Sequence, residues 1–124
     1  MEVLSYENIY GNVLERSIMA FQLGAALLDA CVLSILEKGD TYGYILTQNV
    51  REVMSISEST LYPVLRRLQK DGYLTTYDKP FDGRNRRYYT ITDNGRLQLE
   101  YYRKEWMEYK NKVEKILLGG NSDE

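Results

Sequence analysis

The hydrophobic positions of the chain repeat with a helical period as far as Gly72. Apolar residues three and four apart predict helices at about 21–38, at about 42–54 and from about 57 to Gly72. Asp40-Thr41 is expected to cap the second helix and Ser57 the third, with Ser55 as a competing cap. The predicted inner faces of the first two helices consist of Leu27, Leu28, Val32, Ile35, Leu36, Ile45, Leu46, Val50 and Val53.

After Gly72 the hydrophobic period changes to two. The segments "YLTTYD" and "RRYYTIT" are rich in Tyr and Thr and flank "KPFDGRN", which is typical of a turn. Thr92-Asp93 then caps a last helix that reaches about Leu118. The order predicts a mainly α, α+β fold: a winged helix-turn-helix with a two-stranded β-wing and a long C-terminal helix. The expected parts are an N-terminal arm or helix (1–20), the winged domain (21–92), a dimerisation helix (93–118) and a disordered tail (119–124).

The third predicted helix has two distinct faces when successive residues are placed 100° apart. The core stripe consists of Leu61, Val64, Leu65 and Leu68. The opposite side carries Ser59, Pro63, Arg66 and Lys70, and Tyr62 and Arg67 lie on the flanks between them. Small polar groups and Tyr suit an approach to base edges, and Arg suits phosphate or guanine. We therefore predict that Ser59, Thr60, Tyr62, Arg66 and Arg67 contact DNA. The alternative is a helix that begins at Pro63 and carries merely solvated arginines.

The charge of the chain is distributed unevenly. Segment 57–96 holds eight basic and five acidic residues, a net charge of +3, whereas the remainder carries −5. Three of the bases, Arg84, Arg86 and Arg87, lie at or beside the predicted hairpin turn, where arginine suits phosphates and a narrow minor groove. Together with the adjacent basic helix they favour DNA binding over the alternative, solubilisation of an exposed strand edge.

The last helix carries a heptad-like stripe. Its members step by three and four residues: Leu99, Tyr102, Trp106, Tyr109, Val113 and Ile116. A stripe that extends beyond a small domain needs a partner, which predicts a homodimer that binds a palindromic site. Tyr102, Trp106 and Tyr109 form either plain interface packing or a stacking site for a planar aromatic small molecule.

Several function classes are excluded or disfavoured by composition. The chain has no His and one Cys, so it lacks Ser-His and Cys-His pairs, a histidine metal site and an internal disulfide. We expect no enzyme activity and no cofactor. The longest apolar run, "GAALLDACVLSILEKG", is interrupted by Asp29, and no export signal is evident, which favours a cytoplasmic location. The alternatives to a DNA-binding regulator are a ligand-binding or a protein-interaction winged-helix protein without specific DNA recognition.

Three segments resemble the PadR family of transcriptional regulators: "CVLSILEKGDTYGYIL", "SESTLYPVLRRLQKDGYL" and "GRNRRYYTITDNGR". The similarity covers about 27–96, and the single helix after the wing is similar to the smaller subfamily. It implies a dimeric repressor that releases DNA when a small molecule binds. It also implies that the residues named above on the third helix and the wing face DNA, and that Trp106 lines an effector site at the dimer centre.

Overall fold

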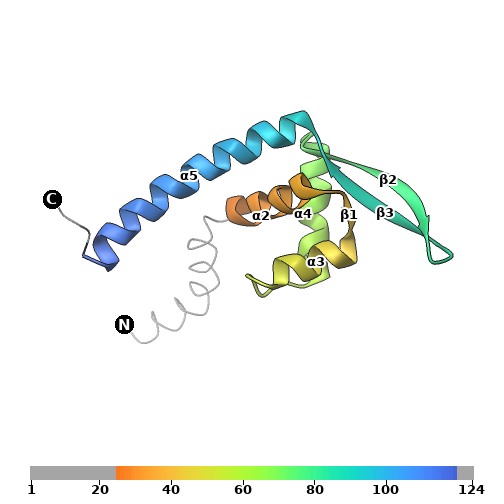
Figure 1. Ribbon diagram of the computed structural model, residues 1–124, viewed down its shortest axis with the longest axis horizontal. Coiled ribbons are helices and arrows are strands. Elements are labelled where there is room, and N and C mark those ends of the chain that lie inside the picture. The colour runs from red at the N-terminus through yellow and green to blue at the C-terminus, as the bar shows by residue number, and fades with distance from the viewer. Residues whose placement is uncertain (1–24, 120–124) are drawn as a thin grey trace, which may run out of the picture.

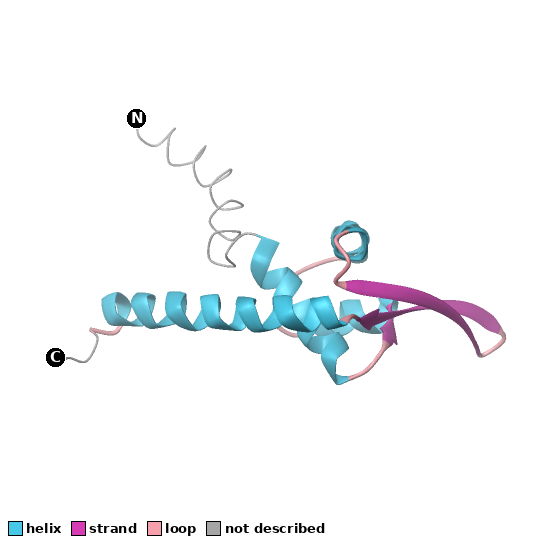
Figure 2. Ribbon diagram, turned by 90° about the horizontal axis from the view of Figure 1, so that it is seen from above, coloured by secondary structure: helices cyan, strands magenta, loops and turns pink. Residues whose placement is uncertain are grey.

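A computed structural model describes residues 25–119 of the chain (Figure 1). Its elements, in order, are α2 (Ala25–Lys38), β1 (Thr41–Tyr42), α3 (Gly43–Arg51), α4 (Glu58–Lys70), β2 (Leu74–Phe81), β3 (Arg84–Ile91) and α5 (Asp93–Leu117). The helices α2, α3 and α4 are grouped together, the β2–β3 hairpin projects on one side, and α5 extends on the other (Figures 1 and 2). This arrangement confirms the predicted winged helix-turn-helix. The predicted arm at 1–20 lies outside the described residues, as does the predicted tail beyond 119.

The hydrophobic core lies where α2, α3, α4, the sheet and the first turns of α5 meet. It consists of Val32, Leu33, Leu36, Leu46, Val50, Leu61, Leu65, Leu68, Leu74, Tyr89, Ile91 and Leu99. Each buried Leu contributes about 2 kcal/mol through removal of apolar surface from water. The predicted inner positions are buried or half-buried with one exception. Val53 is 72% exposed, because α3 ends at Arg51 and Val53 lies in the turn that follows.

Side-chain caps fix where the last two helices begin. The Ser57 hydroxyl accepts a hydrogen bond from the Thr60 amide at 3.3 Å, so Ser57 and not Ser55 caps α4. The Thr92 hydroxyl accepts from the Gly95 amide at 2.9 Å and caps α5 as predicted. After α4 the chain turns at Gly72, whose φ of +84° favours glycine.

The predicted cap at Asp40-Thr41 is wrong, because Thr41–Tyr42 forms a strand instead. It pairs antiparallel with Tyr88 and Tyr89 of β3, which gives a three-stranded sheet in the order β1-β3-β2. The Asp40 carboxylate accepts a hydrogen bond from the Tyr77 hydroxyl at 2.8 Å, so it holds the wing and does not cap α3.

The wing is longer than the sequence predicts. Phe81 and Arg84 are the last paired residues, so only Asp82 and Gly83 form the turn. Their φ angles are +57° and +77°, as a two-residue type I′ hairpin turn requires. The segment "KPFDGRN" is therefore mostly strand, and the twisted hairpin projects far beyond the core (Figure 2).

A buried ion pair joins three helices. The Asp29 side chain of α2 is only 3% exposed, and its two oxygens accept hydrogen bonds from the Arg67 guanidinium of α4 at 2.7 and 3.0 Å. The Tyr102 hydroxyl of α5 donates to the same carboxylate at 3.3 Å. The hydrogen bonds from Arg67 to Asp29 raise the pKa of the guanidinium above its ordinary value. The orientation of α4 is thus tied to both α2 and α5.

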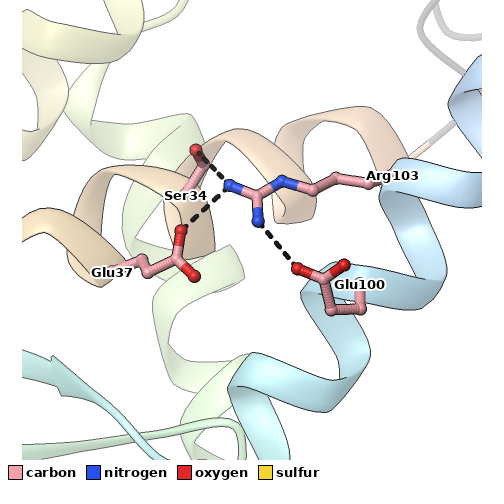
Figure 3. A network of polar contacts seen from close by, with 4 residues as sticks. All are labelled: Ser34, Glu37, Glu100 and Arg103. Atoms are coloured by element: carbon pink, nitrogen blue, oxygen red, sulfur yellow. Dashed lines mark hydrogen bonds and ion pairs between the residues drawn. The ribbon is translucent and has the colours of Figure 1, made fainter.

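A second polar cluster joins α5 to α2 at the surface (Figure 3). The Arg103 guanidinium donates to Glu37 at 2.9 Å and to Ser34 at 3.4 Å on α2, and to Glu100 at 2.9 Å on its own helix. The partners are partly exposed, so this cluster adds modest stability and mainly fixes the position of α5.

We expect Gly95→Ala to destabilise the domain by about 2–3 kcal/mol, because overpacking against backbone cannot be relieved by a rotamer change. A Cβ at this position would collide with the Tyr73 carbonyl oxygen and lie 2.7 Å from Ile91 Cγ1. Thermal denaturation measures the effect. The neighbouring exposed Asn94→Ala should change stability by less than about 0.5 kcal/mol. Equal melting temperatures for the two variants would contradict the close contact.

The adjacent residues Arg66 and Arg67 provide a matched test of the buried ion pair. Arg67→Ala leaves the Asp29 carboxylate buried without its partner, and we expect a loss of about 2 kcal/mol, because Arg67 is itself 42% exposed. Arg66→Ala removes an exposed arginine that forms no ion pair among the described residues, so stability should stay within about 0.5 kcal/mol. Urea unfolding at neutral pH measures both. Identical midpoints would show that the pair contributes nothing.

Candidate nucleic-acid interface

The outer side of α4 carries the residues that the helical period predicts. Leu61, Leu65 and Leu68 are buried and Val64 is half-buried, whereas Ser59, Thr60, Pro63, Arg66 and Lys70 are exposed. At its N-terminal end the Ser57 hydroxyl lies 2.9 Å from that of Ser59 and 3.3 Å from that of Thr60. The helix therefore presents small hydroxyl groups first and a cation two turns later, a surface that can reach base edges and phosphates.

Tyr62 lies on the flank of α4 and packs against the first turn of α3. A Cβ added to Gly43 would lie 2.5–2.9 Å from the hydroxyl oxygen and two ring carbons of Tyr62, so only glycine permits this contact. Burial raises the pKa of Tyr62, and the nearby Glu58 carboxylate adds to that effect. Tyr62 consequently remains a neutral hydroxyl donor at neutral pH, held between the two helices.

Arg67 occupies the other flank of α4, and its role is structural in the first place. Both of its terminal nitrogens donate to Asp29, so the orientation of the guanidinium is set from within the domain. The contact with DNA that the sequence predicts for Arg67 could use only the 42% of the side chain that stays exposed. Arg66 carries the more available positive charge of the two.

Aromatic rings line one face of the wing and the strand beside it. Tyr77 and Tyr88 stack with centroids 5.5 Å apart and an interplanar angle of 12°. Tyr42 of β1 meets Tyr88 edge-on at 5.4 Å and lies 6.2 Å from Phe81. Because such pairs each contribute about 1 kcal/mol beyond surface burial, they stiffen the hairpin and fix it to the body of the domain.

The three wing arginines occupy different environments. Arg84 is exposed beside the turn, whereas the Arg86 guanidinium lies 4.6 Å from the Tyr42 ring centroid and 5.3 Å from that of Phe81. Arg87 is exposed and projects from the opposite face, with an ion pair to Asp78 at 3.5 Å. Exposed pairs of this kind contribute little, so Arg84 and Arg87 are available cations and Arg86 is held against aromatic rings.

The wing and α4 converge around Tyr89. Burial raises the pKa of this core tyrosine, and the positive charges of Arg87 and Arg66 oppose that shift. Tyr62 of α4 and Arg87 of β3 also lie around the same small hollow as Tyr89, so the flank of α4 adjoins β3.

The sequence alone does not single out two residues that matter here: Asp29, which positions α4 from below, and Tyr44, which lies at the surface. In the sequence, Asp29 is a charge that interrupts an apolar run. A lone acid in such a run indicates a buried ion pair, and Asp29 is indeed buried. Tyr44 follows Gly43 in the first turn of α3 and is 53% exposed. Its position beside a glycine that accommodates a tyrosine ring is apparent only in three dimensions.

The stripe predicted on α5 divides into two parts. Leu99 is fully buried in the chain's own core, so it offers no surface to a second copy and does not fit the predicted interface. Tyr102 packs against the same core and donates to Asp29. Farther along, the Trp106 and Tyr109 rings lie 6.4 Å apart and tilted by 37°. Ile116, near the end of the helix, is 82% exposed.

Neither a metal site nor a membrane span is found in the part of the chain that the structure describes. Between residues 25 and 119, no three or more Cys, Asp or Glu side chains are grouped so that they could hold a metal ion. Within the same range, no helix combines the length and the apolar character that crossing a membrane requires.

Comparisons with known proteins agree with the geometry. The transcriptional regulator Rv3488 of Mycobacterium tuberculosis is 37% identical over 103 residues, which cover 82% of this chain and 91% of that protein. The solved structure of smu.1704 from Streptococcus mutans superposes with a TM-score of 0.74 at 42% identity, covering 82% of this chain and 95% of the other. Bacillus subtilis PadR, solved in complex with operator DNA, gives a TM-score of 0.57 at 28% identity over 61% of this chain and 45% of that one.

The model of the PadR-like family of transcriptional regulators matches residues 32–101, which include the helices α3 and α4 and the whole wing. The match spans more than half of the chain and contains the three motifs on which the resemblance depends, except for Cys31 at the start of the first. With an outward-facing polar α4, a basic wing and a single long helix after it, the chain belongs to the PadR-like family of transcriptional regulators.

Proposed function

We propose that this regulator binds a specific DNA site as a dimer, with α4 in the major groove and the wing on the adjacent backbone or minor groove. The observation that carries the proposal is that the exposed cation Arg66 on the outer side of α4 is accompanied by exposed Arg84 and Arg87 on the adjoining wing. A helix and a hairpin that adjoin and both carry exposed cations can contact neighbouring grooves of a duplex together. Bacillus subtilis PadR, which this chain resembles, has been solved with operator DNA and supports the same use of the fold.

The exposed apolar residues of α5 support a second copy of the chain as its partner. Six of the ten large hydrophobic side chains that the described residues leave exposed lie at 97–118: Leu97, Tyr101, Met107, Ile116, Leu117 and Leu118. Exposed apolar surface of this extent on a helix that projects beyond its domain favours burial against a partner. We assign the interface to the rest of the predicted stripe, which is half-buried Trp106, Tyr109 and Val113 with exposed Ile116, because Leu99 and Tyr102 already pack inside the protomer.

Repression and release by a small molecule are the finer parts of the proposal. A dimer bound across a promoter excludes the transcription machinery, which makes repression the simplest outcome. A planar aromatic effector would stack on Trp106 and Tyr109, since Tyr102 is engaged with Asp29. The cytoplasm is the compartment that fits such a regulator. The alternatives are a ligand-binding or protein-interaction role without specific DNA recognition, and the next experiment distinguishes them from the proposal.

Fluorescence anisotropy with a labelled duplex from upstream of the protein's own coding region tests DNA binding. We expect affinity at least about a hundredfold above that for a scrambled duplex at physiological salt. Arg66→Ala and Arg84→Ala should weaken binding and each reduce the slope of log affinity against log salt by about one, because each removes a phosphate contact.

The control is Lys115→Ala, which removes a cation near the far end of α5 and should leave the affinity unchanged. Equal affinity for the two duplexes, or binding insensitive to salt, would contradict sequence-specific recognition and favour one of the alternatives.

Light scattering after size-exclusion chromatography tests the dimer. We expect twice the chain mass of 14.5 kDa. Ile116→Glu should raise the dissociation constant by at least about tenfold, because it places a charge in an apolar contact. Val53→Glu alters a residue that is similarly exposed, at 72% against 82%, but lies in the turn after α3, and it should leave the mass unchanged. A monomeric wild-type protein would exclude the proposed assembly.

A further inference from the structure

A small hollow lies between α4 and the wing, where the first turn of α3 reaches both. Its volume is about 200 Å³, and its lining includes Gly43 and Tyr44 of α3, Tyr62 of α4, and Arg86 and Arg87 of β3. Pockets for drug-sized ligands are usually 300–1,000 Å³, so this hollow suits a single small group. No carboxylate lines it, although Glu58 acts on Tyr62 and Asp78 pairs with Arg87.

The side chains around the hollow are hydrogen-bond donors with unused capacity. The Tyr44 oxygen accepts a hydrogen bond from the Gln48 amide at 2.9 Å, which leaves its own O–H proton for another acceptor. Arg86 Nε is buried and has no hydrogen-bond partner among the described residues. A buried donor without a partner calls for an explanation, and an acceptor bound beside Arg86 is one.

The surrounding charges favour an anionic acceptor. Arg86 and Arg87 both contribute to the lining, although their side chains leave opposite faces of β3. Arg86 is held by the Tyr42 ring, and Arg87 pairs with Asp78 at 3.5 Å. Tyr42 is the N-cap of α3 but makes no side-chain capping bond, which leaves the positive end of that helix without a side-chain acceptor. The non-bridging oxygens of a backbone phosphate can accept hydrogen bonds from the tyrosine hydroxyls, and their negative charge suits the nearby helix end and arginines.

We infer that this hollow holds one phosphate of the DNA backbone in each half-site, with Tyr44 and Tyr62 as hydroxyl donors. This inference rests on the proposed function. When a helix lies in the major groove and a wing in the adjacent minor groove, the sugar–phosphate strand that separates the two grooves must pass between them. The hollow occupies that position, because its lining comes from α4 on one side and β3 on the other. The phosphate fixes the register of both elements on the duplex.

Tyrosine-to-phenylalanine variants test the inference, because they remove one hydroxyl and keep the ring. We expect Tyr44→Phe and Tyr62→Phe each to weaken binding roughly tenfold, the usual effect of a hydrogen bond to a charged group. The loss should be equal for the upstream duplex and, at low salt, for a scrambled one, because a phosphate carries no sequence information. The salt slope should not change, since no charge is removed. Tyr101→Phe, at an exposed tyrosine of α5, is the control and should bind like the wild type.

Methylphosphonate substitution locates the phosphate. Each backbone phosphate of the upstream duplex is replaced in turn by a neutral methylphosphonate, and one position in each half-site should weaken wild-type binding. In the Tyr44→Phe/Tyr62→Phe double variant the same methylphosphonate should reduce the binding affinity much less than it does for the wild type. The reason is that the protein change and the phosphate change remove the same contact. Fully additive losses at every position would overturn the inference.

The remaining outcomes separate this inference from the proposed function. Wild-type discrimination between the duplexes, combined with unchanged binding by both phenylalanine variants, overturns the phosphate site and leaves the function standing. Loss confined to the upstream duplex indicates a base contact and also overturns it. If amide resonances of Gly43 and Tyr44 respond to inorganic phosphate but no variant alters DNA binding, the hollow binds a free anion and not DNA. Absence of discrimination by the wild type overturns the proposed function itself.

Discussion

The ion pair between Asp29 and Arg67 is the contact on which the arrangement of this protein depends. The ion pair is bidentate, and its carboxylate is nearly buried. The Tyr102 hydroxyl donates a further hydrogen bond to the same carboxylate. Through it, α2, α4 and α5 meet at one carboxylate. A charge buried at this depth is tolerated only with its partner in place, so the pair permits one orientation of α4 and disfavours others. The direction in which α4 presents its outer side follows from that constraint.

The arginines of this protein have two different roles. Arg66 and Arg67 are neighbours in sequence, but one faces outward and the other holds the helix in place. The wing repeats this division, because Arg86 lies against Tyr42 and Phe81 whereas Arg84 is exposed at the turn. A net positive segment therefore overstates the number of cations available to a ligand. Arg67 and Arg86 hold the helix and the wing in place, and Arg66 and Arg84 are the cations that remain exposed to a ligand.

The helix α5 has two functions along its length. Its first turns complete the core through Leu99 and reach Asp29 through Tyr102, and Arg103 joins it to α2 (Figure 3). Its distal part projects beyond the domain with exposed apolar residues such as Ile116. A rigid helix connects the two parts, so the position of a partner on the distal part is defined relative to α4. This geometry is what a two-fold DNA reader needs, since half-site spacing admits little error.

The sequence by itself determined the four described helices and the hairpin strands, but not β1, and it determined the faces of α4. Local signals are sufficient there: helical period, the Ser57 and Thr92 caps, Gly72 and the Asp-Gly turn act within a few residues of themselves. It also identified the motifs that place the chain in its family. The tertiary structure decided which polar residue finds which distant partner. Asp29 pairs with Arg67 across 38 positions, Asp40 with Tyr77 across 37, and Thr41–Tyr42 joins β3 as a strand. The hydrophobic period cannot predict such contacts, because it describes one segment at a time. A buried charge or an unpaired strand edge finds its hydrogen-bond partner in whichever segment the fold brings beside it.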